Sequence, residues 1–345
     1  ADDNSKFDEW KANLESKLQS DKNFRQLWNQ FNNLEIPEVE LEWSSDEASR
    51  VVGGKILKEY GLSNKFIIGG SADLAASTKQ IISDNTFGSN NFGGNSIEFG
   101  IREHAMGGIV NGLALHSNLI PYGSTFLVFS DYMRPSMRLA SLMNVNSLFI
   151  FTHDSIYLGE DGPTHQPIEH LMSLRLIPNL DVIRPSNSME LIHSYRYALE
   201  KRDNPKAIIL SRQNMKFFDN DVSYKDFQTG AYEFMPGSDI TLIATGSELE
   251  LAFEISTKLK DLSIQIISAP ILNRLNEERL ESLSLNQNIF TIELGRTIGW
   301  DTYIQNIKKS FSIDSFGESA PIDQLAEKFN FNAEKISDEI RSLLN

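Results

Sequence analysis

Short apolar runs alternate with longer amphipathic stretches along most of this chain, and this alternation constrains the fold more than any other feature. The runs at 148–151, 240–244 and 264–268 are too short for helices and suit buried strands. Stretches of helical length, such as 188–200 and 248–260, lie between such runs. Strands that alternate with helices in this way form parallel sheets covered by helices. The sequence therefore predicts an α/β protein with two consecutive open, mostly parallel sheet domains.

Changes in this pattern divide the chain into segments. Phe7, Trp10 and Leu14 recur at helical spacing near the start, which predicts two amphipathic helices packed on a domain. The Ser-Ser-Asp-Glu run at 44–47 is typical of a helix N-terminus. We expect a helical connector (1–43), a first α/β domain (44–216), a polar linker (217–229) and a second α/β domain (230–345).

The composition narrows the classes of function. The 345 residues carry a formal net charge of −15, which disfavours nucleic acids and anionic membranes as partners. There is no Cys, so disulfides, thiolate metal sites and Cys nucleophiles are excluded, and a reducing cytoplasm is the expected location. No apolar stretch approaches the roughly 20 residues that span a bilayer, and the polar, acidic start predicts no secretory leader.

A long loop at 147–169 carries the densest group of ionisable residues. This stretch begins with the apolar run 148–151, and the glycines and prolines of the loop after that run prevent a helix. Five ionisable residues of this loop come within thirteen positions: His153, Asp154, Glu160, Asp161 and His165. Open α/β sheets bind ligands at the carboxyl ends of their strands, so we favour a role in proton transfer or polyol recognition. A solvated surface loop is the alternative, while a metal site is disfavoured because the histidine spacing matches no compact zinc signature.

Two further features suggest a binding site. Glu103 stands where a predicted strand at 96–100 meets a helix, a position that favours an ionised carboxylate, although helix-start acids are commonly only caps. Phe126, Phe129 and Tyr132 recur every three residues, which predicts one helical face. Such a face is usually part of a core, but it could also stack on a flat heterocycle.

Seven of these stretches, in order, resemble the transketolase family. They are GGSADLA, GIREHAMGG, PYGSTFLVF, THDSIYLGEDGPTHQP, LSRQN, ATGSELELA and FGESAP. The resemblance covers the chain from about residue 44 onward, and it corresponds to the family's pyrimidine-binding and C-terminal domains. The family's N-terminal diphosphate-binding domain has no counterpart here, since no GDG…N metal motif occurs, and residues 1–40 resemble only the connector after that domain.

The resemblance implies thiamine diphosphate as cofactor. Glu103 would bond the aminopyrimidine ring and favour the imino tautomer, whose nitrogen takes the thiazolium proton. Phe126, Phe129 and Tyr132 would form the aromatic pocket around that ring, and Asp73 would lie near the cofactor. The ligands of the accompanying Mg²⁺ or Ca²⁺ are expected on the missing domain, so no metal ligand is assigned to this chain.

The resemblance also implies the substrate contacts. Glu103, His153 and His165 are the expected catalytic residues. The expected sugar-phosphate contacts are Arg50, Ser77, His153, Asp161, His165 and Arg212. One departure is Tyr157, which stands where the family usually has Gly and would narrow the channel or reshape its mouth. His116, His170 and His193 match no motif, so surface or packing positions are expected for them.

These features predict half of a transketolase, either the second subunit of a split enzyme or a fragment of a longer chain. The complete enzyme would move a two-carbon ketol unit from a ketose phosphate to an aldose phosphate, in the pentose phosphate pathway. A diphosphate-binding domain or subunit is the expected partner, in a homodimeric arrangement, and no activity is expected without it. The alternatives are dihydroxyacetone synthase, deoxyxylulose-phosphate synthase, a 2-oxo acid dehydrogenase subunit, or a non-catalytic dimerisation module.

Overall fold

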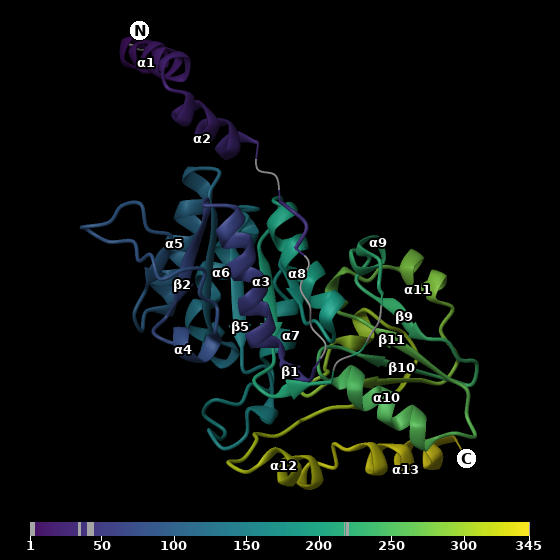
Figure 1. The fold of residues 1–345 in the computed structure, drawn as a ribbon. Helices are drawn as coiled ribbons and strands as arrows, with labels where there is room; N and C mark the ends of the chain where they lie inside the picture. Colours follow the sequence, from purple (N-terminus) through teal and green to yellow (C-terminus); the bar gives the residue numbers. More distant parts are fainter. Residues whose placement is uncertain (1–3, 34–35, 40–44, 217, 219–220, 345) are drawn as a thin grey trace.

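The N-terminal helices stand apart from the rest of the protein. The structure is a computed structural model, and it describes residues 4–33, 36–39, 45–216, 218 and 221–344. Helices α1 (Ser5–Ser20) and α2 (Lys22–Asn32) project beyond the first domain (Figure 1). Neither helix contains a buried residue, and Phe31 at the end of α2 meets Phe66 at a ring-centroid distance of 5.1 Å. The expected packing of both helices on a domain is therefore not found: apart from the contact of Phe31 with Phe66, the described contacts between aromatic rings of these helices lie within each helix.

The first domain is built on a six-stranded sheet in the order β3-β2-β4-β5-β7-β6, and every neighbouring pair is parallel. Its strands are β2 (Ile67–Ser71), β3 (Ser96–Glu98), β4 (Ile120–Phe126), β5 (Leu148–Thr152), β6 (Asp181–Ile183) and β7 (Lys206–Leu210). Its helices are α3 (Ser49–Ser63), α4 (Ala75–Thr78), α5 (Glu103–His116), α6 (Ser130–Leu142), α7 (His170–Arg175) and α8 (Ser188–Glu200).

Helices cover both faces of this sheet. Ile150 of β5 packs in one apolar cluster with side chains of α3 and α8, whereas its neighbour Phe149 packs in another with α5, α6 and α7. Because successive side chains of a strand point to opposite faces, a strand buried on both faces must be apolar throughout. This explains why the central strands read as continuous apolar runs.

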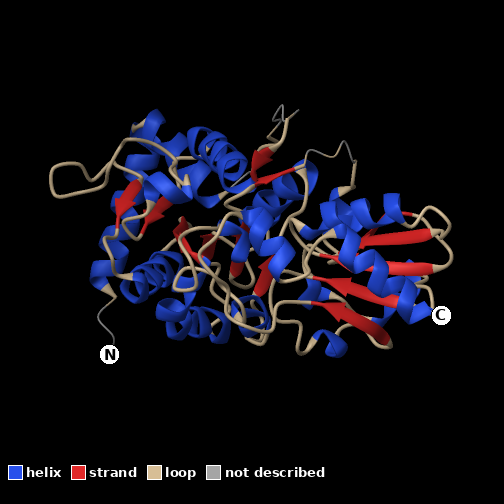
Figure 2. Cartoon of the chain, turned by 90° about the horizontal axis from the view of Figure 1, so that it is seen from below, coloured by secondary structure: helices blue, strands red, loops and turns tan. Residues whose placement is uncertain are grey.

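The second domain contains a five-stranded sheet in the order β13-β12-β10-β11-β9, in which only β9 is antiparallel to its neighbour. Figure 2 shows these strands as a separate group near the C terminus. The strands are β9 (Tyr232–Met235), β10 (Ile240–Ala244), β11 (Ile264–Ser268), β12 (Ile289–Ile292) and β13 (Ile307–Phe311). The helices are α10 (Glu248–Lys258), α11 (Glu277–Leu283), α12 (Ile322–Lys328) and α13 (Ala333–Leu344). The predicted fold class, two consecutive and mostly parallel sheets after a helical segment, is confirmed.

A buried ionic network joins the two domains. Arg184, which follows β6, donates hydrogen bonds to Asp154 at 2.7 and 3.1 Å and to Glu248 of α10. A second buried pair, Arg175 with Glu293, lies on the same interface, with both hydrogen bonds at 2.7 Å. All five side chains are almost fully buried, so the loop after β5 is fixed against the second domain.

Two local predictions differ from the structure. The expected helix start at 44–47 is wrong for its described residues: Glu47 and Ala48 form β1 (Glu47–Ala48), which pairs antiparallel with β8 (Asn214–Met215), and the helix begins at Ser49. Ser44 itself lies outside the described residues. Within the polar stretch 217–229, the structure has a short helix, α9 (Tyr224–Phe227), whose Phe227 is buried.

None of the helices described here is long and apolar enough to cross a membrane.

Candidate active site

The carboxyl ends of β2 and β4 open into a cavity of about 600 Å³. The chain leaves β2 toward β3 on one side and returns to β4 on the other, so the strand order reverses between β2 and β4. Such a reversal leaves a crevice outside the strand ends, where α/β proteins bind ligands. The cavity is lined by Ala72, Asp73, Leu74, Ile101, Glu103, Phe126, Phe129, Tyr132 and His165.

Glu103 provides the buried charge of this cavity. It is the first residue of α5, and only 8% of its surface is exposed. Backbone N–H groups at a helix N-terminus stabilise an ionised carboxylate there. No other described residue donates a hydrogen bond or forms an ion pair with this carboxylate. Glu103 lines the open cavity, so a hydrogen-bond donor of a ligand there could reach its carboxylate.

The three predicted aromatic residues form one wall of the cavity. The rings of Phe126 and Phe129 are stacked, with centroids 5.8 Å apart and planes 10° apart, and Tyr132 follows at 6.1 Å from Phe129. The helical face predicted for them is wrong, because Phe126 ends β4, Phe129 lies in the 3₁₀ turn η1 (Leu127–Phe129) and Tyr132 belongs to α6. The chain turns within these residues, which still brings the rings together.

His165 and His153 approach the same wall from the long loop. The His165 ring meets Phe126 and Phe129 edge-on at 6.3 and 5.7 Å. The His153 ring is stacked on Phe126, with centroids 3.7 Å apart, and its backbone has a φ of +61°. Left-handed backbone in a non-glycine residue costs of order 1–3 kcal/mol and is concentrated at functional sites. The fold thus brings both imidazoles of the loop to one wall of the cavity.

The environment of His153 keeps its imidazole neutral. Burial, together with the charges of Arg50, Arg212 and His165, lowers the pKa of His153 to about 3. Below pH 6.5 the unfolded chain would therefore bind a proton here that the native protein does not bind. Because stability rises with pH wherever the unfolded state binds more protons, this group destabilises the fold as pH falls from about 6.5 toward 3.

We expect the free energy of unfolding to fall less steeply with decreasing pH in His153→Asn than in the wild type. For one proton, the contribution removed is up to about 1.4 kcal/mol per pH unit between roughly pH 6.5 and 3. The measurement is urea unfolding of the wild type and the variant at pH 7.5 and pH 5. His116→Asn, at an exposed position at the end of α5, is the control. An identical pH dependence in the wild type and His153→Asn would contradict the expectation.

Two arginines form a positive region beside the histidines. Arg50 and Arg212 line a second cavity of about 770 Å³ between the two domains. Burial and the neighbouring Arg212 lower the pKa of Arg50, and its Nε is buried without a hydrogen-bond partner in the described chain. Uncompensated guanidinium groups are suited to a phosphate, which they can hold bidentately.

Three other residues predicted to contact the cofactor or the substrate are Ser77, Asp73 and Asp161. The backbone carbonyl of Ser77 accepts a 2.5 Å hydrogen bond from Arg50 Nη1, so Ser77 orients the arginine. Asp73 lines the first cavity at a φ of +61°. Asp161 is exposed in the Gly-rich turn and lines neither cavity.

Tyr157, the residue expected to alter the channel, lies in the second cavity and not in the first. Its hydroxyl donates to the carbonyl of Phe331 at 2.9 Å, and its ring packs on the core of the second domain. Tyr157 therefore attaches the long loop to the second domain and forms a wall of the cavity that contains Arg50 and Arg212.

Sequence reasoning missed the residue that holds the long loop in shape. Gln166 is buried, and its Nε2 donates to the carbonyls of Ile156, Gly159 and Glu318 at 2.9–3.1 Å. It links both ends of the loop to the second domain. Nothing in the sequence indicated this role for the Gln166 side chain, because the carbonyl groups that it binds come together only in the folded protein.

The first cavity fits the expected aminopyrimidine. A flat heterocycle could stack on Phe126 and Phe129 while its ring nitrogen donates to Glu103. The lining of this cavity includes one buried carboxylate and no lysine or arginine, so it does not suit the diphosphate. Arg50 and Arg212 line the other cavity, so within the described residues the aromatic wall and these two arginines lie in different cavities.

Comparisons with known proteins agree with this arrangement. The family model "Transketolase, pyrimidine binding domain" matches residues 48–217, and "Transketolase-like TK C-terminal domain" matches residues 230–332. A transketolase of Staphylococcus aureus is 42% identical over 324 residues, which are 90% of this chain and 48% of that protein. The chain thus spans about half the length of the curated relatives that it matches.

Two solved structures are similar in fold. A transketolase from Pichia stipitis, in complex with sedoheptulose 7-phosphate, matches with a TM-score of 0.91 at 29% identity, over 99% of this chain and 53% of that chain. A split-gene transketolase, described as an inactive β4 tetramer, matches with a TM-score of 0.71 over 87% of this chain and 98% of that chain. Its 24% identity supports the fold alone. Both family matches, and the 42% identity with the transketolase of Staphylococcus aureus, show that the chain belongs to the transketolase family.

Proposed function

We propose that this chain is the pyrimidine-binding half of a transketolase that transfers a two-carbon ketol unit from a ketose phosphate to an aldose phosphate, in the pentose phosphate pathway. The observation that carries the proposal is Glu103, a buried carboxylate without a described partner in an aromatic cavity. A carboxylate at such a site accepts a strong hydrogen bond, because little water competes with it.

Each residue has a role that its environment supports. When bound, thiamine diphosphate would supply the carbon nucleophile for reaction with the sugar carbonyl group. Glu103 holds a proton at the pyrimidine ring, and Phe126 and Phe129 exclude water from that hydrogen bond. Phe126 also supports the stacked His153 ring, which orients the imidazole.

The histidines and arginines act on the substrate. His153 is neutral at physiological pH, so one ring nitrogen accepts a proton or hydrogen bond while the other donates. We assign proton exchange with sugar hydroxyl and carbonyl groups to His153 and His165. Arg50 and Arg212 hold the phosphate, which explains how a protein of net charge −15 binds an anion.

We infer that the diphosphate and its Mg²⁺ or Ca²⁺ bind to a separate domain or subunit. Three observations support this: the chain spans 48% of its curated relative, it lacks the GDG…N motif, and it aligns with 98% of a chain from a split-gene transketolase. We propose a cytoplasmic assembly in which this chain forms dimers and a diphosphate-binding partner completes each site.

The test is ketol transfer by the purified chain with and without its partner. The chain alone, with thiamine diphosphate and Mg²⁺, should not convert xylulose 5-phosphate and ribose 5-phosphate above the uncatalysed rate. Addition of a diphosphate-binding half, expressed separately from a relative or from the same genome, should give activity that saturates at an equimolar ratio. Full activity of the chain alone would contradict the need for a partner. Inactivity of a verified complex that binds cofactor would contradict transketolase function itself.

A further inference from the structure

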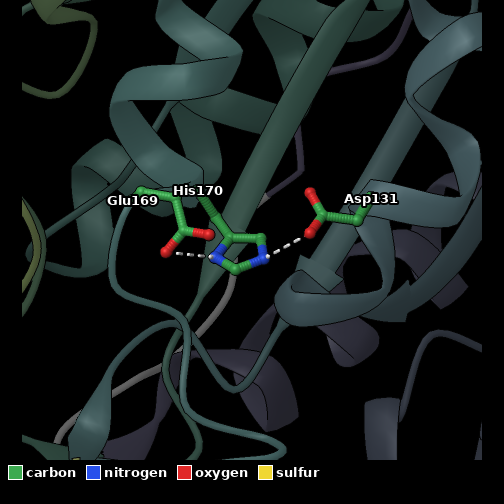
Figure 3. A group of neighbouring side chains, drawn as sticks. All are labelled: Asp131, Glu169 and His170. Atoms are coloured by element: carbon green, nitrogen blue, oxygen red, sulfur yellow. Dashed lines mark ion pairs between the residues drawn. The ribbon is translucent and has the colours of Figure 1, made fainter. Parts of the chain in front are cut away.

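Three ionisable side chains outside both cavities converge between α6 and α7. Asp131 lies in the first turn of α6, Glu169 is the N-cap residue of α7, and His170 is the first residue of that helix. Figure 3 shows the imidazole between the two carboxylates. His170 Nε2 lies 3.2 Å from Asp131 Oδ2, and Nδ1 lies 3.9 Å from Glu169 Oε2.

The imidazole is buried and incompletely satisfied. His170 is 4% exposed, yet neither ring nitrogen makes a hydrogen bond with good geometry to any described residue. A buried polar atom without a hydrogen bond costs of order 1–3 kcal/mol, so native proteins rarely leave one. Both carboxylate side chains are 58% exposed and can rotate, whereas the ring is fixed in the protein.

The contact between His170 and Asp131 has the length of a hydrogen bond without its geometry, and the same length also fits a metal site. Zinc binds nitrogen and oxygen ligands at about 2.0–2.2 Å, so neighbouring ligand atoms of a tetrahedral site lie roughly 3.3–3.6 Å apart. The 3.2 Å between Nε2 and Asp131 Oδ2 is close to this spacing. In a metal site the ion lies on the axis of the imidazole lone pair, and a carboxylate oxygen that binds the same ion lies to one side of that axis. Such an arrangement would explain why His170 Nε2 and Asp131 Oδ2 are close but do not form a hydrogen bond.

We propose that Asp131, Glu169 and His170 bind a divalent transition-metal ion such as Zn²⁺, with water completing the coordination. One ligand atom from each residue can be chosen so that all three lie within 4.8 Å of one another, a span that rotation of the exposed carboxylates can close. Imidazole suits Zn²⁺, Ni²⁺ and Cu²⁺, whereas Mg²⁺ prefers oxygen ligands. The site is therefore different from that of the Mg²⁺ or Ca²⁺ expected with the cofactor.

The frame of the site is already rigid. Arg134 of α6 donates to both the hydroxyl and the carbonyl of Ser173 in α7, each at 2.9 Å, and so holds the two helices together. Ligands on a fixed frame lose little entropy when an ion binds. Asp131 precedes Tyr132 of the cofactor cavity, so a bound ion would hold the first turn of α6, and with it this ring, in place.

The test is calorimetric titration of ZnCl₂ into the tag-free, EDTA-treated chain at pH 7.5. We expect saturable binding of one ion that MgCl₂ does not displace, with affinity lowered at least about tenfold in His170→Gln and in Asp131→Asn. His116→Gln, in which an exposed histidine is removed, should bind as the wild type does. Co²⁺ should give visible absorption bands that the His170 variant lacks.

Circular dichroism confirms that each variant is folded, and if His170→Gln is not, the exposed Asp131→Asn variant decides. Equal zinc affinity in the wild type and the folded variants would overturn the proposal, as would the absence of saturable binding to the wild type. A His170 that titrates above pH 7 by NMR and is unaffected by Zn²⁺ would identify the group as a protonated imidazole between two carboxylates, which also overturns it. None of these outcomes depends on ketol transfer.

Discussion

Arg184→Met is expected to lower the free energy of unfolding by about 3–5 kcal/mol, because it leaves buried charges without a partner. Arg184 has no exposed surface, and its guanidinium lies between Asp154 of the long loop and Glu248 of α10. It also donates to the carbonyl and the hydroxyl of Thr245 at 2.9 and 3.0 Å. Burial alone would lower the pKa of Arg184, but the charges of Glu248 and Asp154 outweigh it and raise that pKa.

The size of the effect depends on removing one partner and not the whole network. Replacing a complete buried ion group by neutral residues is often close to neutral for stability, whereas removing one member leaves a desolvated charge. Arg184→Met combined with Asp154→Asn and Glu248→Gln should therefore recover part of the lost stability. Urea unfolding at pH 7.5, followed by circular dichroism, measures both variants.

Arg341→Met is the matched control for this comparison. Arg341 forms a two-hydrogen-bond pair with Asp261, at 2.5 and 2.8 Å, but its side chain is 45% exposed. Exposed ion pairs contribute little to stability because water screens them, so this variant should unfold near the wild-type urea concentration. Equal losses of stability in Arg184→Met and Arg341→Met would show that the buried network does not hold the domains together.

The sequence predicted the strands and helices where local pattern and burial agree. The predicted strands at 240–244 and 264–268 and the helix at 188–200 coincide with β10, β11 and α8. Apolar runs this short, between segments of helical length, favour a central strand that is covered on both faces. The prediction of a helix start at 44–47 was wrong because Glu47 and Ala48 pair with β8, which is far away in the sequence.

The sequence motifs named residues that line the candidate site, but they did not predict how those residues are arranged. The motifs identified Glu103, His153, His165 and the aromatic residues, and the structure brings all of them to the carboxyl ends of β2 and β4. Arg184 and Gln166 have no motif chemistry, since their partners lie in the other domain. Gly246, at a φ of +56°, shows the same limit: a Cβ there would lie 2.7 Å from Arg184 Nε, a constraint that only the fold reveals.

Glu103→Gln is expected to reduce kcat of the assembled enzyme by about 10²–10⁴-fold, the usual contribution of a positioned acid–base group. The amide has nearly the same shape as the carboxylate, so the aromatic wall and the first turn of α5 should remain intact. It cannot accept the proton or carry the negative charge that favours the donor nitrogen of the ring. The measurement is steady-state ketol transfer by the complex of this chain with its diphosphate-binding partner, at saturating thiamine diphosphate.

The control for this variant is Glu98→Gln, an exposed carboxylate at the end of β3, which should keep wild-type activity. Cofactor affinity, measured separately by calorimetry, distinguishes the role of Glu103. A variant that binds cofactor normally but turns over slowly has lost the proton and charge that Glu103 supplies during the reaction. A variant with weaker cofactor binding and unchanged kcat has lost only a binding contact, which would contradict the catalytic role. Because the carboxylate of Glu103 also lies at the N-terminus of α5, circular dichroism and urea unfolding of Glu103→Gln distinguish a loss of turnover from a loss of folding.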